Sequence, residues 1–72
     1  MQTSTETVIA RKALEVCAER LEAWADGESK AQIAAEQRQD RVAAEGHYNT
    51  RKNYLGLAET ARIALIGLGA AS

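Results

Sequence analysis

The chain has few of the residues that support small folds by covalent or metal cross-links. It contains one cysteine, one histidine, no proline and no phenylalanine in 72 residues. One cysteine excludes an intramolecular disulfide, and one cysteine with one histidine makes a poor set of metal ligands. A core of this size rarely stabilises a fold by more than about 3–5 kcal/mol, so self-association is the support that remains. We therefore expect a homodimer without metal or cofactor.

Recognisable catalytic motifs are also missing from the sequence. There is no Ser/His/Asp set, no phosphate-cradling glycine loop and no pair of inward carboxylates. Cys17 stands thirty positions from the single histidine, His47, in a segment with an apolar helical pattern. We expect Cys17 to pack as a small core residue and the protein to lack enzymatic activity.

The charge and hydropathy pattern argues against a membrane protein. The longest uncharged run, residues 63–72, is too short to cross a bilayer, and we see no basic-then-apolar leader in the sequence. The formal net charge of −1 gives little general affinity for nucleic acid. We expect a cytoplasmic protein.

The composition predicts an all-α fold. Alanine supplies 15 of the 33 apolar residues, glutamate is frequent and β-branched residues are few, all of which favour helix. Apparent stop signals divide the chain into three helices, at about 4–25, 30–45 and 50–69. We expect one small helical domain over residues 1–72.

The predicted helix boundaries depend on caps and glycines. Thr3 to Glu6 fits a capping box with Thr3 as N-cap, and Ser29 to Gln32 fits a second one. Gly27 suits the residue after a helix end, and Gly46 begins a second predicted turn in which Asn49 or Thr50 caps the last helix. Because an internal glycine costs a helix only about 1 kcal/mol, the second and third helices could instead be continuous, which would make the fold a long two-helix hairpin.

The first and last predicted helices carry apolar faces of the same spacing, in steps of four and three residues. These helices should form the apolar frame, with Leu21 and Trp24 in the core. The faces are Ala10, Leu14, Cys17, Leu21 and Trp24 in the first helix, and Tyr54, Ala58, Ala61, Leu65 and Leu68 in the last.

The last predicted helix is apolar on more than one side. Leu55, Ile63 and Ile66 lie away from its main face, and a helix that is apolar all round is usually buried among several partners. We expect these three residues to form the dimer interface.

Basic and aromatic side chains gather around the predicted turn at Gly46. Tyrosine and arginine are frequent at the energetic centres of protein interfaces, which predicts contact with a larger partner protein. The alternative is a solvated turn. The residues are Arg38, Arg41, His47, Tyr48, Arg51 and Lys52.

The same region, residues 41–55, also permits a DNA-binding alternative. A helix, a glycine and a second polar helix follow one another there, as in helix-turn-helix motifs. The fit is poor, because the first of these helices lacks apolar residues to fix the angle between them. An acidic stripe on the first predicted helix offers another charged surface, which more often is only the solvated side of a helix. It comprises Glu15, Glu19, Glu22 and Asp26.

These observations favour a non-enzymatic regulator or inhibitor that acts by occupying the surface of a partner protein. Short chains without chemical motifs are common among accessory proteins of phages and other mobile elements. We therefore expect such an accessory protein, directed at a host defence or regulatory protein.

Overall fold

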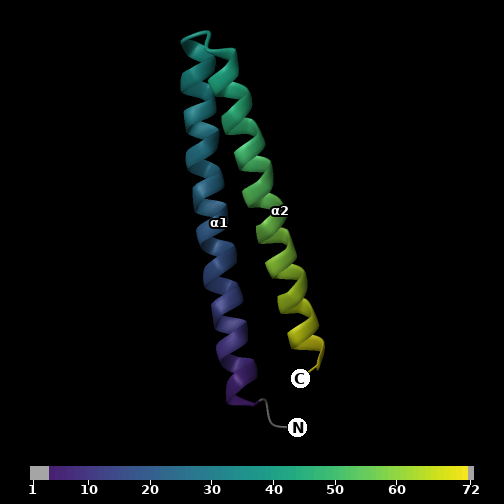
Figure 1. The fold of residues 1–72 in the computed structure, drawn as a ribbon. Coiled ribbons are helices and arrows are strands. Elements are labelled where there is room, and N and C mark those ends of the chain that lie inside the picture. Colours follow the sequence, from purple (N-terminus) through teal and green to yellow (C-terminus); the bar gives the residue numbers. More distant parts are fainter. Residues whose placement is uncertain (1–3, 72) are drawn as a thin grey trace.

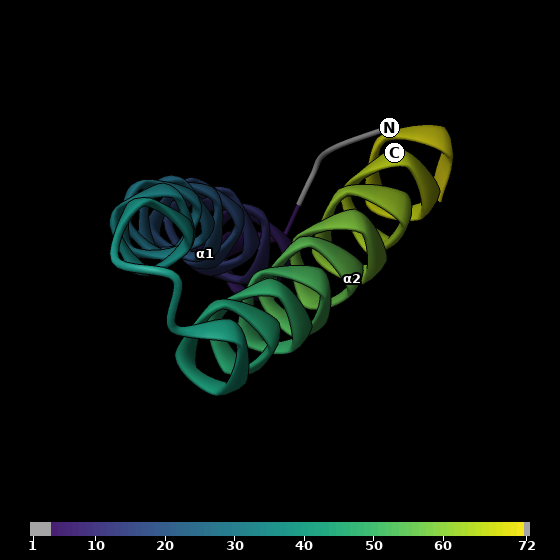
Figure 2. The same cartoon turned by 90° about the horizontal axis from the view of Figure 1, so that it is seen from above.

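Two long antiparallel helices form the fold in the computed structural model, which describes residues 4–71 (Figure 1). Helix α1 spans Thr5–Gln37 and helix α2 spans Arg41–Ala71. Figures 1 and 2 show the helices side by side near the turn and spreading apart toward their other ends. They form a rod that measures 57 Å by 14 Å by 11 Å. The described residues contain no strand, so the all-α prediction is confirmed. The three-helix prediction is wrong; the hairpin alternative has the observed number of helices.

The turn between the helices lies at Arg38–Asp40. Gln39 takes a left-handed backbone conformation with φ 61° and donates its N–H to Glu36 O at 3.0 Å, while Asp40 donates to Ala35 O at 2.9 Å. This pair of bonds is a Schellman motif, which satisfies the last carbonyls of α1. Asp40 then begins α2, because its Oδ1 accepts from Ala43 N at 3.1 Å as an N-cap.

Both predicted turns are wrong, because α1 continues through Gly27 and Ser29 and α2 through Gly46 and Asn49. Each internal glycine costs only about 1 kcal/mol, which packing along the whole hairpin outweighs. The observed turn does not require a glycine, since a glutamine holds its left-handed position. A turn near the middle of the described chain also lets two helices of almost equal length pair throughout, whereas a turn at residue 27 would leave nearly half of the longer helix without a neighbour.

The helices meet along a seam with the spacing of a coiled coil, in alternating steps of three and four residues. Alanines are the most deeply buried side chains of the seam, and among the described residues Leu21 is the only larger side chain that is buried. Small side chains allow the two backbones to approach closely but bury little area. The seam comprises Thr7, Arg11, Leu14, Ala18, Leu21, Ala25, Glu28, Gln32 and Ala35 of α1, and Ala44, His47, Arg51, Tyr54, Ala58, Ala61, Leu65 and Leu68 of α2.

The predicted apolar face of the last helix therefore matches the seam of α2, from Tyr54 to Leu68. The predicted face of α1 is correct only in part. Leu14 and Leu21 lie in the seam, but Cys17 and Trp24 are exposed and Ala18 and Ala25 take the buried positions. Packing selects the smaller side chains there, so the predictions that Cys17 and Trp24 belong to the core are wrong.

The N-cap of the first helix lies one residue later than predicted. Ser4 is the N-cap, and its Oγ accepts from Thr7 N at 3.0 Å and contacts Thr7 Oγ1 at 2.8 Å. Thr3, the predicted cap, lies outside the described residues. Thr7 takes the position opposite the cap that Glu6 was expected to hold.

Candidate protein-binding surface

Tyr48 lies at the centre of a cationic cluster on α2, near the turn. The Arg51 guanidinium carbon and the Lys52 ammonium nitrogen are each 5.5 Å from the centroid of its ring. Both distances are within the range of cation–π attraction. The helix places these groups together because residues three and four apart share one face. Tyr48 remains 40% exposed, so the ring is available for contact while two cations hold its orientation. We call Tyr48, Arg51 and Lys52 the Tyr48 patch.

Arg51 joins this patch to the seam. Its backbone position faces α1, its side chain is half-buried, and Nε is buried without a hydrogen-bond partner among the described residues. Buried donors normally find acceptors.

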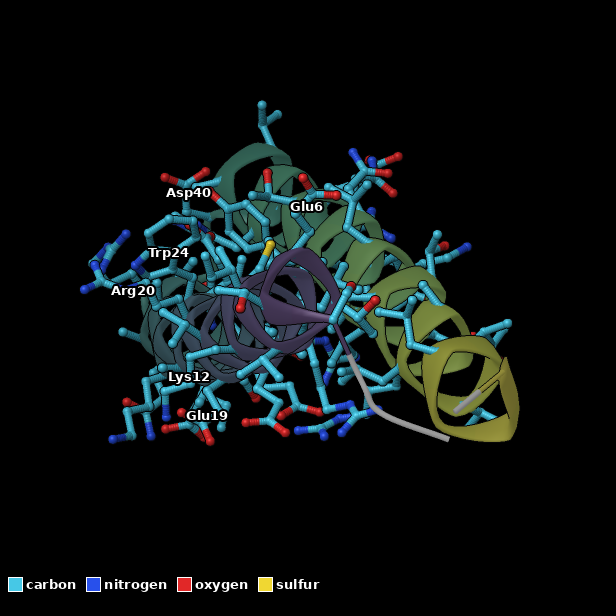
Figure 3. All side chains as sticks on the ribbon, turned by 90° about the horizontal axis from the view of Figure 1, so that it is seen from below. Glu6, Lys12, Glu19, Arg20, Trp24 and Asp40 are labelled. Atoms are coloured by element: carbon cyan, nitrogen blue, oxygen red, sulfur yellow. The ribbon has the colours of Figure 1, made fainter. Side chains whose placement is uncertain are left out.

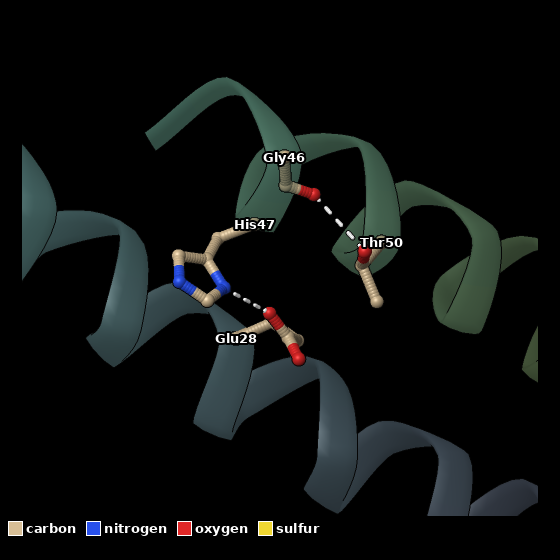
Figure 4. A network of polar contacts seen from close by, with 4 residues as sticks. All are labelled: Glu28, Gly46, His47 and Thr50. Carbon is tan, nitrogen blue, oxygen red and sulfur yellow. Dashed lines mark hydrogen bonds and ion pairs between the residues drawn. The ribbon is translucent and has the colours of Figure 1, made fainter. Parts of the chain in front are cut away.

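His47, the neighbour of Tyr48, points into the interhelical space instead of joining the patch. Its Nδ1 lies 2.6 Å from Glu28 Oε2 on α1, and both side chains are partly buried (Figure 4). On the same helix, Thr50 donates from Oγ1 to Gly46 O at 3.0 Å, the usual way in which a helical threonine satisfies its hydroxyl. His47 was predicted to bind a partner, but its side chain instead contacts Glu28 of the other helix.

Arg38 and Arg41, the other two residues predicted to bind a partner, lie at the two ends of the turn. Arg38 is the C-cap of α1 and Arg41 opens α2, and both are exposed. Arg41 precedes Tyr48 by seven residues, so it lies on the same stripe of α2 two helical turns away. The structure thus brings Tyr48, Arg51 and Lys52 into contact and leaves Arg38 and Arg41 as separate cations at the same end of the rod.

The residues predicted for DNA binding do not form a helix-turn-helix. Residues 41–55 belong entirely to α2, which has no break at Gly46. The predicted second helix of that motif is a continuation of the first, so the angle that places a recognition helix in the major groove is absent from this segment.

The residues predicted for the dimer interface are all exposed. Leu55 follows Tyr48 by seven residues and lies on the same stripe of α2. Ile63 faces directly away from the seam, and Ile66 points in a direction between those of Leu55 and Ile63. Charged side chains at Lys52, Glu59 and Arg62 surround this group.

The acidic stripe of α1 is divided between two ion pairs and solvent. Arg62 donates from Nε to Glu22 Oε2 at 3.0 Å and from Nη2 to Oε1 at 2.5 Å, across the two helices. This hydrogen-bonded contact lowers the pKa of Glu22 below its ordinary value of 4.5 and raises the pKa of Arg62. Lys30 pairs with Asp26 at 3.3 Å along α1. The Glu22 and Arg62 side chains remain about half exposed, so the contact orients the helices more than it stabilises them.

Sequence reasoning missed two polar contacts between the helices, Glu28 with His47 and Glu22 with Arg62. The residues are 19 and 40 positions apart, and only the location of the turn determines which side chains meet. Opposite charges at the edges of two matching heptad patterns were a usable signal, but it required the correct hairpin.

The described residues offer no group of three or more side chains suited to holding a metal ion. Neither helix within residues 4–71 has a stretch of the length and hydropathy needed to cross a bilayer. Comparison of the chain with family models, with curated proteins and with solved structures finds no match.

Proposed function

We propose that this chain is a non-enzymatic regulator or inhibitor that binds a larger protein through the Tyr48 patch. The observation that carries the proposal is the 40% exposed ring of Tyr48 with the Arg51 and Lys52 cations each 5.5 Å from its centroid. Tyrosine and arginine are enriched at the centres of protein interfaces. The patch is suited to a partner surface that presents carboxylates beside an apolar contact.

The position of the patch supports binding by occupation of a surface. It lies near the turn, at one end of a narrow rod, and Arg41 extends it toward the tip. A narrow tip can enter a concave site on a larger protein. In this proposal the chain is an accessory protein of a phage or mobile element, and the partner is a host defence or regulatory protein.

Capture of partners from host lysate tests the proposal when it is done with matched variants. Wild-type protein, Tyr48→Ala and Lys12→Ala are each immobilised, and the retained proteins are identified by mass spectrometry after nuclease treatment. Lys12 is an exposed cation on α1 and leaves the patch intact. We expect one host protein to be retained by wild type and Lys12→Ala and lost with Tyr48→Ala. Equal retention by all three would exclude the patch as the binding surface.

DNA binding through residues 41–55 is the second candidate, favoured only by the cluster of cations there. It is tested by titrating labelled duplex DNA at several salt concentrations, because phosphate contacts make affinity fall steeply with added salt. Binding of this kind, lost in Arg51→Ala, would support it in place of the protein-binding proposal.

A further inference from the structure

The seam separates the surface of the hairpin into two flanks of different character. Glu22 and Arg62 pair on one flank. Trp24 and Ala64 each follow a member of that pair by two residues, a step that turns a helical side chain by about 200°. Both therefore lie across the seam from the ion pair, on the other flank of the hairpin.

This second flank carries an uncharged stripe from each helix, with members seven residues apart. We call it the Trp24 face, and its main members are Ala10, Cys17, Trp24 and Ala31 of α1 with Leu57 and Ala64 of α2. Trp24 is 53% exposed and Leu57 is 57% exposed. The matching α1 stripe on the opposite flank holds Glu15, Glu22, Ser29 and Glu36. Figure 3 shows Trp24 on a different side of α1 from Lys12 and Glu19.

Tyr54 supports the tryptophan from beneath. The two ring centroids are 5.7 Å apart with planes inclined at 53°, so Trp24 is held at the edge of the seam and not loose in solvent. An exposed large ring in a fixed orientation is a feature of interface anchors.

Three glycines border the Trp24 face, at positions 27, 46 and 67. An added Cβ would meet no atom of the chain within 4 Å at any of them. Each therefore costs its helix about 1 kcal/mol relative to alanine without relieving a clash inside the hairpin. Glycines at these places allow a further backbone to approach closely.

The hairpin also exposes more surface than a compact protein of its mass. Its accessible area is 5376 Å², whereas a folded monomer of this mass exposes about 4,400 Å². The radius of gyration is 16.4 Å, against about 11 Å for a compact chain of this length. The excess of about 1,000 Å² is similar to the area of about 800 Å² that each partner buries in a stable complex.

We propose that a second copy of this chain covers the Trp24 face, so that two hairpins form an antiparallel four-helix bundle. A two-fold axis near Trp24, close to the middle of α1, would set this face of one copy against the same face of the other. The axis places the first half of one α1 beside the second half of its partner, where the small residues Gly27 and Ala34 border the face.

This assembly is independent of the proposed partner-binding function. Tyr48 precedes Arg62 by two heptads and therefore lies on the flank of the ion pair, away from the Trp24 face. The bundle would present two Tyr48 patches at its opposite ends. It uses Leu57 in place of the surface first expected from Leu55, Ile63 and Ile66, because charged residues interrupt that surface.

Sedimentation equilibrium of the full chain from low to high micromolar concentration tests the proposal. We expect wild type to reach twice the chain mass of 7.8 kDa, and Leu57→Glu to remain a helical monomer. Ile63→Glu is the matched control, since Ile63 is on the same helix and is 61% exposed but faces away from both flanks. A monomeric wild type, a larger assembly, or dissociation by Ile63→Glu and not by Leu57→Glu would overturn the proposal.

A glycine pair gives a second test that does not depend on introducing a charge. Gly27→Ala should weaken dimerisation by about tenfold or more, because a methyl group would obstruct the close approach. Gly56→Ala, on the outer side of α2, should leave the dimer intact, and each variant should retain the helical spectrum of wild type. Equal dimerisation of the two variants would contradict the assignment of the face.

Cys17 provides an independent readout in the wild-type chain. The thiol is exposed in a single hairpin and lies on the Trp24 face. Its rate of reaction with a disulfide reagent should therefore fall as protein concentration rises, and should stay constant in Leu57→Glu. A rate in wild type that does not change over the concentrations at which the mass doubles would place the dimer contact elsewhere and overturn the proposal.

Discussion

His47 Nδ1 lies 2.6 Å from Glu28 Oε2, and this contact joins α2 to α1 at partly buried positions of the seam. The pair lies between Ala35 and Ala44 near the turn and Ala25 and Leu21 farther along the seam. A polar contact at a seam position favours one alignment of two helices over shifted ones. It therefore contributes to the specificity of the hairpin as well as to its stability.

Removing this contact should weaken the hairpin measurably. His47→Ala leaves the Glu28 carboxylate in the seam without its imidazole partner, and we expect the free energy of unfolding to fall by about 1 kcal/mol. Urea denaturation followed by circular dichroism measures the change. Asn49→Ala, an exposed change on the same helix, is the control; an equal loss in both variants would show that the contact contributes nothing specific.

The pair of Glu22 and Arg62 should make stability depend on pH in the acid range. Its contribution is present at neutral pH and is lost as pH falls through the lowered pKa of Glu22, below the ordinary value of 4.5, while Arg62 stays charged. Wild type should be more stable than Glu22→Gln at about pH 7, and the difference should shrink toward about pH 3. Unfolding by urea across this range measures it. A difference that is constant with pH would exclude the ion pair as its source.

The turn offers a stabilising substitution at Gln39. Its φ of 61° is a left-handed conformation that glycine adopts without the steric cost of a side chain. Gln39→Gly should stabilise the hairpin by about 1 kcal/mol, seen as a higher Tm in thermal denaturation. Gln37→Gly, in the last turn of α1, should have the opposite effect. A lower Tm for Gln39→Gly would show that the side chain has a role that outweighs its strain.

The seam should be sensitive at Leu21 and tolerant at the outer surface. Leu21→Ala removes the only large side chain in the buried set and should cost about 2–3 kcal/mol. Ile63→Ala, at an exposed site of the other helix, should change stability by no more than about 0.5 kcal/mol. Denaturant titration of both variants at one protein concentration gives the comparison. Similar losses would mean that the outer surface of α2 is packed in solution.

The sequence allowed the helical class and one face of α2 to be predicted, because composition and spacing are local properties. Tyr54, Ala58, Ala61, Leu65 and Leu68 follow a regular pattern, and they do face α1. On α1 the prediction chose the wrong one of two adjacent apolar stripes. It used the stripe of Cys17 and Trp24, whereas the stripe of Ala18 and Ala25 faces α2. Hydrophobicity favoured the one with Cys17 and Trp24, whereas close packing buries the smaller one.

The turn could not be located in this way because its strongest local signals lie elsewhere. Gly27 and Gly46 resemble helix ends, yet each adds only a small local cost that interhelical packing overcomes. The real turn uses Gln39 in a conformation that glutamine seldom adopts. Asp40 was the available signal, as an N-cap after a polar run. The candidate patch was easier to predict, since Tyr48, Arg51 and Lys52 are close in sequence and meet on any helix that contains them.

The nearly equal length of the helices places the start of α1 and the end of α2 at the same end of the rod, with the turn at the other (Figure 1). The helix ends are therefore separated from the turn by the length of the rod. A body fused to either end would be held up to 57 Å from the tip, and would not obstruct what the tip contacts. Fluorophores attached at the start of α1 and the end of α2 of one copy would lie at the same end of the rod, while those on two antiparallel copies would lie at opposite ends.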